Sequence, residues 1–488
     1  MTRVLVIGLD GFDYALASRW LDELPALAGL AGRGAFGPLE SIVPPVTPPA
    51  WTSMVTGRDP GHFGFTDFTV RRPGTYATPQ LVHSGMVRVD TVFDLADRAG
   101  LRTLALGVPV SYPPPPRRHG ATLSCLMAPS AERRVTDPPE LQERWLGLTS
   151  QPFLFDVAST DPDVRGDPGA LLAKLRRFDD QRFDLAQALA GQDDWELLFV
   201  VCTGTDRIAH YFLHHADEQH VAHPADGRWA DAMRDHYRHC DRRLGALLET
   251  VGADTAVLVV SDHGVQRLDG KLHLNDWLAD NGFLVLEERP ERPCPLGEAP
   301  VDWARTRAWA SGFGGQVFCN LAGRYPSGWL DDAGVEQTVA ELLEALAGLE
   351  HEDGRPVGVD AFRNEEVFSG PQRDRCPDLC LQLDGLRLLT RNAVGGDGLV
   401  SPPDADVASH AMSGFLAMAG PGVPAAGHCQ ALSIYDVAPT ILDLLGVEGA
   451  AGLPGASLPD ELTDPGDEVY SAADRAALAS RLETLYLD

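Results

Sequence analysis

Six acidic and imidazole side chains lie next to short apolar runs at widely separated points of the chain. They are Asp10, Asp206, His210, Asp262, His263 and His410. Carboxylate oxygens and imidazole nitrogens are ligands of Zn²⁺, Mn²⁺ and similar divalent ions, and the set contains no thiolate. If the fold brings these side chains together, the sequence predicts a divalent-metal site.

Asp206 and His210 are four residues apart in the stretch TGTDRIAH. At that spacing two side chains face the same side of a helix, so they can hold one ion, and His410 could complete the group. The alternative for an Asp and a His at this spacing is a solvated helix face or an ion pair.

Asp262 and His263 are adjacent, and a loop at a strand end would let both side chains turn inward. Asp10 could add a third ligand for a second ion. Taken alone, Asp10 could equally be a helix N-cap, and the Asp–His pair could be a surface pair. The position of every member of the set beside an apolar run favours a shared site.

A hydroxyl-rich stretch, PPVTPPAWTSMVTG, occupies residues 44–57 and could provide a nucleophile. Its four hydroxyl side chains belong to Thr47, Thr52, Ser53 and Thr56. We expect Pro48 at the first helical position, which makes Thr47 the N-cap with its side chain free of the helix body. Gly57 is the expected C-cap. The other three hydroxyls then fall within or at the end of the helix and are expected to be structural.

Four apolar runs must position these residues: 4–9, 197–202, 255–260 and 414–420. Each run is short, rich in apolar residues and non-alternating, which is typical of strands buried on both faces of a parallel sheet. Helical patterns, such as those at 230–252 and 435–446, lie between the runs. Because the carboxyl ends of parallel strands share one edge of a sheet, we predict an α/β sandwich that gathers the carboxylates and imidazoles there.

The charge and composition limit the classes of partner that the protein is expected to bind. The 488 residues carry a formal net charge of -30, which argues against a nucleic acid partner but allows a small phosphorylated ligand whose charge a metal balances. The eight cysteines are scattered without a CxxC motif, as expected for reduced thiols. With no signal-peptide pattern and no apolar stretch of about 18 residues, we expect a cytoplasmic protein that does not contact a membrane.

The arrangement resembles the alkaline phosphatase superfamily and, within it, the type I phosphodiesterase/nucleotide pyrophosphatase family with its prokaryotic phosphohydrolase/phosphomutase-like branch. The resemblance covers roughly residues 1–450. It is carried, in the family's order, by VLVIGLDGFD, PPVTPPAWTSMVTGRDPG, CTGTDRIAHYF, VVSDHGV, KLHLNDWL, FCNLAGRYPSG, SHAMSGFLAMAGPGV and IYDVAPTILDLLGV. It implies an alkaline-phosphatase-like three-layer sandwich with a mostly parallel central sheet and inserted cap segments.

The resemblance also implies two metal sites and a threonine nucleophile. The two ligand sets would be Asp206, His210 and His410, and Asp10, Asp262 and His263. Zn²⁺ is the first choice for both ions, with Mn²⁺ or Mg²⁺ as alternatives. The nucleophile, nine residues before the TG that ends its motif, would be Thr47, beside the metals. The implied activity is cleavage of a phosphodiester or pyrophosphate-type ester of a small substrate through a phosphothreonine intermediate.

One substrate contact of the family is missing. Animal nucleotide pyrophosphatases carry an Asn three residues after the nucleophile, and Ala50 stands at that position here. The backbone N–H of Thr47, or the side chains of Lys271, His273 or Asn275, would have to stabilise the phosphoryl oxygens instead. The alternative for Asn275 is a helix start packed under a cap.

Several other activities occur on this kind of scaffold. A sulfatase needs a C/S-x-P-x-R motif at its nucleophile, and no Cys here begins one. A metal-dependent phosphomutase or phosphomonoesterase would use the same residues and is not separated by the sequence. A lipid-headgroup phosphotransferase would normally carry a membrane anchor. A non-catalytic binding protein would be expected to have lost ligands, and none is missing.

The chain is expected to divide into a discontinuous core with two insertions. The core would consist of residues 1–110, 196–265 and 400–455. Residues 111–195 and 266–399 would form caps over the site, and residues 456–488 an acidic C-terminal tail ending in a surface helix.

Overall fold

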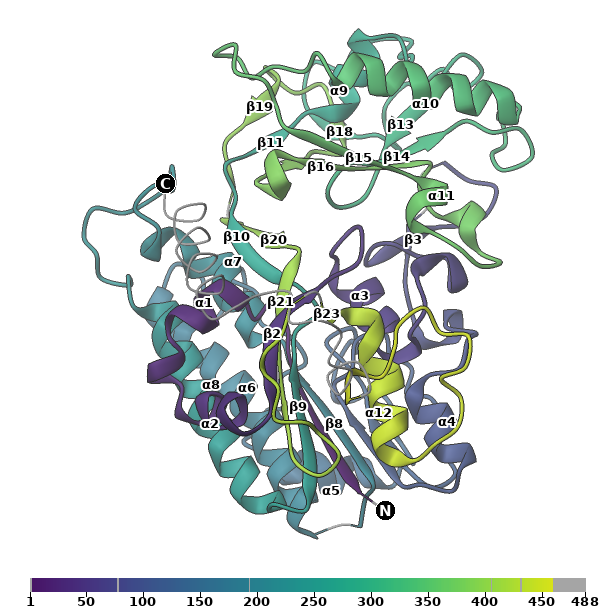
Figure 1. The fold of residues 1–488 in the computed structure, drawn as a ribbon. Coiled ribbons are helices and arrows are strands. Elements are labelled where there is room, and N and C mark those ends of the chain that lie inside the picture. Colours follow the sequence, from purple (N-terminus) through teal and green to yellow (C-terminus); the bar gives the residue numbers. More distant parts are fainter. Residues whose placement is uncertain (1, 77–78, 193, 405, 431, 460–488) are drawn as a thin grey trace.

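The computed structural model describes residues 2–76, 79–192, 194–404, 406–430 and 432–459. Figure 1 shows a larger α/β lobe that contains both described ends of the chain and a smaller lobe above it. The expected C-terminal surface helix lies outside the described residues. No helix of the described part of the chain is long and apolar enough to cross a membrane.

A ten-stranded sheet forms the centre of the larger lobe, counted over the described residues. In spatial order its strands are β22 (Gly427–His428), β2 (Ala35–Glu40), β21 (Ser413–Ala419), β9 (Thr255–Val260), β1 (Arg3–Leu9), β8 (Leu197–Cys202), β5 (Thr103–Leu106), β6 (Ala121–Leu123) and β7 (Thr136–Asp137), with β23 (Leu432–Ser433) beside β2. All four predicted strands are confirmed as β1, β8, β9 and β21. Every residue of β8 and β9 is buried, as their non-alternating sequences predict.

The direction of the strands explains how the predicted residues meet. β1 pairs in parallel with both β8 and β9, so these three strands end at the same edge. β21 runs antiparallel to β9 and therefore begins at that edge. A residue that precedes β21, such as His410, reaches the same place as residues that follow β1, β8 and β9.

Helices cover both faces of this sheet, as Figure 1 shows. One face carries α2 (Pro25–Arg33), α6 (Pro168–Gln192) and α8 (Ala232–Val251), and the other carries α3 (Thr47–Thr56), α4 (Val92–Arg98) and α12 (Val437–Leu445). Alternate residues of β1 pack into the two layers, Leu5 and Ile7 into the first and Val4 and Val6 into the second. The predicted three-layer sandwich with a mostly parallel central sheet is confirmed, and the helices predicted at 230–252 and 435–446 correspond to α8 and α12.

The smaller lobe has its own sheet and core. Its seven strands, within the described residues, are β13 (Ala308–Ala310), β14 (Gln316–Cys319), β16 (Leu379–Leu383), β17 (Leu388–Thr390), β11 (Gly270–Leu272), β19 (Val400–Ser401) and β15 (Val359–Arg363). Helices α9 (Leu274–Asp280) and α10 (Asp332–Leu346) pack on it. Two short antiparallel pairs accompany it, β3 (Thr69–Arg71) with β4 (Pro79–Leu81) and β12 (Cys294–Pro295) with β18 (Ala393–Val394).

A two-stranded ribbon connects the lobes. β10 (Gly264–Arg267) leaves the larger sheet directly after Asp262 and His263, and β20 (Ala408–Ala411) returns antiparallel to it. Figure 1 shows the ribbon between the two lobes. The remaining helices are α1 (Tyr14–Arg19), α5 (Leu141–Gly147), α7 (Gly204–Ala216) and α11 (Asn364–Val367).

The expected division into a core and two caps stays a prediction. The strand pairing shows that the segment 111–195 supplies β6 and β7 to the large sheet and α6 to one of its faces. The sheet of the smaller lobe is built from residues 270–401, which overlap the second expected insertion.

Candidate metal centre

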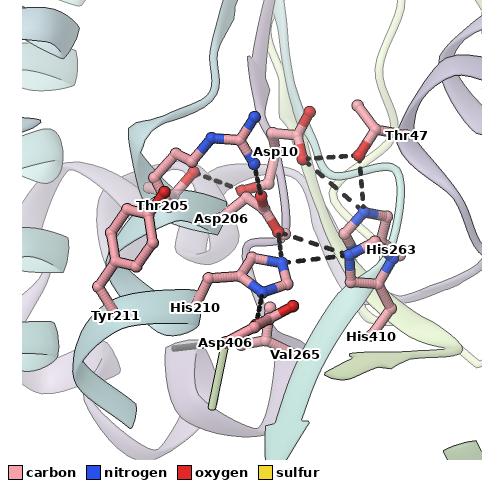
Figure 2. A network of polar contacts seen from close by, with 12 residues as sticks. Asp10, Thr47, Thr205, Asp206, His210, Tyr211, His263, Val265, Asp406 and His410 are labelled. Atoms are coloured by element: carbon pink, nitrogen blue, oxygen red, sulfur yellow. Dashed lines mark hydrogen bonds and ion pairs between the residues drawn. The ribbon is translucent and has the colours of Figure 1, made fainter. Parts of the chain in front are cut away.

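The structure brings all six predicted ligands together at the carboxyl edge of the large sheet. Figure 2 shows five of them, Asp10, Asp206, His210, His263 and His410. Asp10 follows β1, Asp206 and His210 lie on α7 after β8, Asp262 and His263 follow β9, and His410 lies in β20. They form the two expected groups of three, and the potential ligand atoms within each group lie within 4.8 Å of one another.

The first group centres on Asp206. Its Oδ1 lies 3.1 Å from Nε2 of His210 and 3.8 Å from Nε2 of His410. The two Nε2 atoms are themselves 3.3 Å apart. Asp206 and His210 lie on one helix face, as their spacing predicts.

The second group surrounds Nε2 of His263. This atom lies 3.3 Å from Oδ2 of Asp262 and 3.7 Å from Oδ1 of Asp10. Thr47 Oγ1 is 3.3 Å from the same Nε2 and 3.5 Å from Asp10 Oδ1. Of the four candidate hydroxyls, Thr47 is therefore the one that joins the metal centre, whereas Thr52 and Thr56 donate to backbone carbonyls of their own helix.

All three imidazoles present Nε2 to the centre, and in two of them Nδ1 faces a backbone carbonyl. His263 Nδ1 lies 3.0 Å from the carbonyl oxygen of Gly264, and His410 Nδ1 lies 2.6 Å from that of Pro45. Carbonyl oxygens accept hydrogen bonds, so these partners assign the proton to Nδ1 and leave the Nε2 lone pair directed at the carboxylates. The two rings stack with centroids 3.7 Å apart, which fixes their orientation.

Two carboxylate oxygens of the centre accept no hydrogen bond from the described residues. They are Asp206 Oδ1 and Asp262 Oδ2, one in each group, and both are buried. Buried carboxylate oxygens without donors are costly unless a cation compensates them. Oxygen and imidazole donors converging on such atoms fit a divalent cation in each group.

The pKa values reflect the crowding of charge. Burial and the neighbouring Asp206 raise the pKa of Asp10 well above its ordinary value, and burial and Asp10 do the same for Asp262. Burial lowers the pKa of His410 to about 4. Burial would also lower the pKa of His210, but the carboxylates of Asp206 and Asp406 outweigh it and raise that pKa to about 10.

Thr47 is the first residue of α3 and not its N-cap, which is the extended residue Val46. The reason is that the N–H of Ala50 bonds to the carbonyl of Val46 at 2.9 Å, which closes the first helical turn one residue earlier than expected. Pro48 and Pro49 then lie in the first turn, where an N–H would have no intrahelical partner. The predicted cap was one residue too late. The hydroxyl of Thr47 nevertheless lies at the positive N-terminal end of the helix. The predicted C-cap Gly57 is confirmed, with φ 63°.

The centre opens into a cavity of about 300 Å³. Thr47, Asp206, His210 and His410 contribute to its wall, together with Arg207. A small group in this cavity could therefore contact Thr47 and the first ligand group at once.

Three polar residues at the centre were not predicted. Trp51 donates to Asp10 Oδ2 at 2.9 Å, Arg207 Nη1 donates to Asp206 Oδ2 at 3.1 Å, and Asp406 Oδ1 lies 2.6 Å from His210 Nδ1. Trp51 is four residues after Thr47, a helical spacing that could have indicated it. Arg207 directly follows a ligand, and Asp406 lies in a loop with no periodic signal.

Of the residues considered for phosphoryl contacts, Thr47 lines the cavity, and the other four lie elsewhere. Ala50 belongs to α3 and is fully buried. The Asn275 side chain is engaged with the backbone of Ala310 and Asn392, as expected for a helix start packed inside the smaller lobe. Lys271 pairs with Asp404 at 3.5 Å, and buried His273 lies beside Gly396. None of the four lines the cavity of about 300 Å³ among the described residues.

A third group of potential ligands, Asp179, His236 and Cys240, lies fully buried behind α7. His236 Nε2 is 2.9 Å from Asp179 Oδ2, and Asp179 Oδ1 accepts the backbone N–H of Gly204 at 3.1 Å. Gly204 is the first residue of α7. The group therefore holds the beginning of the helix that carries Asp206 and His210.

The chain matches one family model and is similar to several solved structures. A family model described as type I phosphodiesterase / nucleotide pyrophosphatase matches residues 4–410. No curated protein matches the sequence. Phosphonoacetate hydrolase from Sinorhizobium meliloti 1021, solved with phosphonoformate, is similar with a TM-score of 0.59 at 17% identity over 91% of this chain and 95% of that chain.

Two mammalian structures are similar as well. Human ectonucleotide pyrophosphatase/phosphodiesterase 5 has a TM-score of 0.52 at 12% identity, over 93% of this chain and 97% of that one. An inactive variant of the murine protein, solved with AMP, has a TM-score of 0.53 at 14% identity, over 94% and 97%. At these identities the likeness extends to the fold, which agrees with the predicted sandwich.

Proposed function

The chain belongs to the type I phosphodiesterase/nucleotide pyrophosphatase family, and from this premise we propose that it is a two-metal phosphohydrolase that uses Thr47 as its nucleophile. The substrate is a small phosphate ester of the phosphodiester or pyrophosphate type. Structurally similar proteins have been solved with phosphonoformate and with AMP, small ligands that carry a phosphonate and a phosphate group.

The observation that carries the proposal is the position of the Thr47 hydroxyl. Oγ1 lies 3.5 Å from Asp10 Oδ1 and 3.3 Å from His263 Nε2, so it can share an ion with them, and it faces the cavity. The N-terminus of α3 favours negative charge at the same point. A hydroxyl with a purely structural role would bond to its own helix, as that of Thr56 does.

The two ligand groups divide the remaining tasks. Divalent ions held there would acidify a coordinated hydroxyl and neutralise phosphoryl oxygens. His263 and His410 hold their Nε2 atoms in place through their Nδ1 partners. Arg207, which contacts Asp206 and lines the cavity, contributes a fixed positive charge next to the phosphoryl group.

The proposed reaction has two displacement steps. The Thr47 Oγ loses its proton and attacks phosphorus, the bond from phosphorus to the leaving oxygen breaks, and that oxygen takes up a proton. Water then attacks the phosphothreonine, the bond between phosphorus and Thr47 Oγ breaks, and the hydroxyl is restored. The product is a phosphate monoester when the substrate is a diester.

Substitution of Thr47 tests this assignment. With bis-4-nitrophenyl phosphate as the substrate, we expect Thr47→Ala to lower kcat by roughly 10³-fold or more, because removal of a nucleophile leaves only binding and electrostatic effects. The bound metal, measured by mass spectrometry, should remain. Thr47→Ser should keep measurable activity and accumulate a 4-nitrophenylphosphoryl-serine.

Thr56→Ala is the matched control, since Thr56 belongs to the same helix and its hydroxyl bonds to the carbonyl of Thr52. Its activity should stay close to that of the wild type. Full activity of Thr47→Ala would refute the nucleophile. Faster turnover of 4-nitrophenyl phosphate than of the diester would instead indicate a phosphomonoesterase with the same machinery.

A further inference from the structure

A second, larger cavity borders the metal centre. It has a volume of about 1230 Å³ and lies between strand β3 and strands β13 and β14 of the smaller lobe. Figure 1 shows β3 beneath this sheet. Asp67 lines both this cavity and the smaller one at the metals, so a bound molecule could extend from one into the other. The volume exceeds the roughly 300–1000 Å³ usual for small-molecule sites.

The charge of this cavity is opposite to that of the whole chain. The charged residues on its wall are Arg71, Arg72, Arg324 and Arg375, with Asp67 and Asp374. The Asp67 carboxylate is already engaged, because it accepts the backbone N–H groups of Phe68 at 2.6 Å and Phe313 at 2.8 Å. A basic wall in a chain of formal net charge -30 favours an anionic ligand at this place.

Arg71 is the best-placed cation of the wall. Its guanidinium lies 3.4 Å from the ring centroid of Phe318 and 5.6 Å from that of Trp309. It bonds to the Tyr325 side chain, and burial lowers its pKa. Among the described residues no carboxylate lies within ion-pair distance of it, because the nearby Asp378 pairs with Arg324.

A guanidinium in this setting is pre-organised for an anion. The stacked rings hold its plane, and the fork of donors that would otherwise bind a carboxylate is left for a ligand. A desolvated charge without a counter-charge is unfavourable, so binding of an anion there is favoured.

We propose that Arg71 anchors a subsite for a second anionic group of the substrate, a carboxylate, sulfate or phosphate remote from the ester that is cleaved. This inference rests on the proposed hydrolase function and narrows its substrate class. The substrate is a phosphodiester with an arm long enough to pass Asp67 and a negative charge at the end of that arm.

A series of matched substrates tests the subsite. Each is a 4-nitrophenyl phosphodiester whose second arm is an arylalkyl chain of stepped length, ending either in a carboxylate or in the neutral carboxamide. In the wild type we expect the carboxylate to raise kcat/KM about 10-fold or more at one chain length, as for a charge-assisted hydrogen bond. This comparison needs no variant.

Variants then assign the effect to Arg71. Arg71→Met should abolish the preference for the carboxylate, measured as the ratio of kcat/KM for the carboxylate to kcat/KM for the carboxamide of the same chain length. Arg71→Lys, which keeps the charge but loses the planar fork, should keep part of the preference. The matched control is Arg228→Met, because Arg228 also stacks on an aromatic ring, Trp229 at 4.9 Å, but lies outside the cavity.

The outcomes separate the subsite from the function. Turnover of the carboxamides with no carboxylate preference at any length would overturn the subsite and leave the hydrolase intact. If no diester is cleaved, the hydrolase fails, and calorimetric titration with the arylalkyl carboxylates alone decides the subsite: binding that Arg71→Met removes supports it, and binding equal in both proteins overturns it. Inorganic phosphate that binds through Arg71 while tethered carboxylates gain nothing would show a free-anion site and overturn the substrate proposal.

Discussion

The three histidines of the metal centre differ in what fixes them. His263 and His410 direct Nδ1 at the neutral carbonyls of Gly264 and Pro45, whereas His210 directs it at the carboxylate of Asp406. A carboxylate partner makes an imidazole a stronger ligand than a carbonyl does. The group that contains His210 should therefore bind its ion more tightly than it would if His210 faced a carbonyl.

Removal of Asp406 should weaken one metal site selectively. We expect Asp406→Ala to lower the zinc affinity of one of the two sites by about 10–100-fold. The Asp406 carboxylate orients the His210 ring and increases its basicity, and the variant loses both effects. Competition with a fluorescent chelator, resolved into two binding steps, measures this.

Asp404→Ala is the control for that experiment. Asp404 lies in the same loop but pairs with Lys271 and Arg391 and not with a ligand. Equal loss of affinity in both variants would mean that the loop, and not the Asp406 carboxylate, determines the effect.

The ligands could be predicted at residue scale because strand ends are visible in a sequence. Asp10, Asp206 and Asp262 each follow a buried apolar run, either directly or within a few residues. The parallel pairing of the strands then brings the three carboxylates to one edge of the sheet. Asp406 could not be predicted, because a loop residue reveals its partner only when the ribbon β10–β20 is folded. The sequence showed that Ala50 stands where relatives carry an Asn. It did not show which groups take over the role of that Asn, and two of the residues considered, Lys271 and Asn275, belong to the smaller lobe.

At the scale of elements, the site depends on how α7 begins. Gly204 opens the helix, and its N–H donates to the fully buried Asp179. A Cβ on Gly204 would lie 2.1 Å from Asp179 Oδ2, so only glycine allows this approach. Asp206 stands two residues later, and its place is set by the same contact. The spacing of Asp206 and His210 is compatible with a helix such as α7, but it gives no indication of this long-range anchor from α6.

Truncation of Asp179 should therefore destabilise the protein. Asp179→Ala leaves the Gly204 N–H and the buried His236 without their acceptor, for which we expect a loss of about 3–5 kcal/mol in the free energy of unfolding. Urea unfolding followed by circular dichroism measures it.

The neighbouring Asp180 is the control, because its carboxylate pairs with His239 and Arg243 while 30% exposed. Asp180→Ala should cost less than about 1 kcal/mol. A small effect of Asp179→Ala, similar to that of Asp180→Ala, would show that α7 does not need this anchor.

At the scale of the whole molecule, the metal centre joins segments that start more than 400 residues apart in the chain. Asp10 lies near the N-terminus and His410 in the ribbon that leads back from the smaller lobe. Ions bound by the two proposed groups would link β1, α7, the end of β9 and β20. Because such ions bind the folded chain and not the unfolded one, they should stabilise the entire fold.

The stabilisation by metal should grow with pH. In the metal-free protein His210 has a pKa of about 10, above its ordinary value of 6.5. Between these two pKa values the folded chain keeps a proton on His210 that the unfolded chain has released. The contribution of this proton to the free energy of unfolding is complete below the ordinary pKa and is lost as the pH rises toward 10. The raised pKa values of Asp10 and Asp262 act in the same direction. A metal-loaded centre has no such loss, because a ligated His210 carries no proton on Nε2.

We expect the difference in Tm between metal-loaded and chelated protein to increase by at least about 3 °C between about pH 7 and about pH 9 in differential scanning fluorimetry. His210→Asn should flatten this increase. A difference that stays constant or shrinks in the wild type would contradict the assignment of His210 as a ligand.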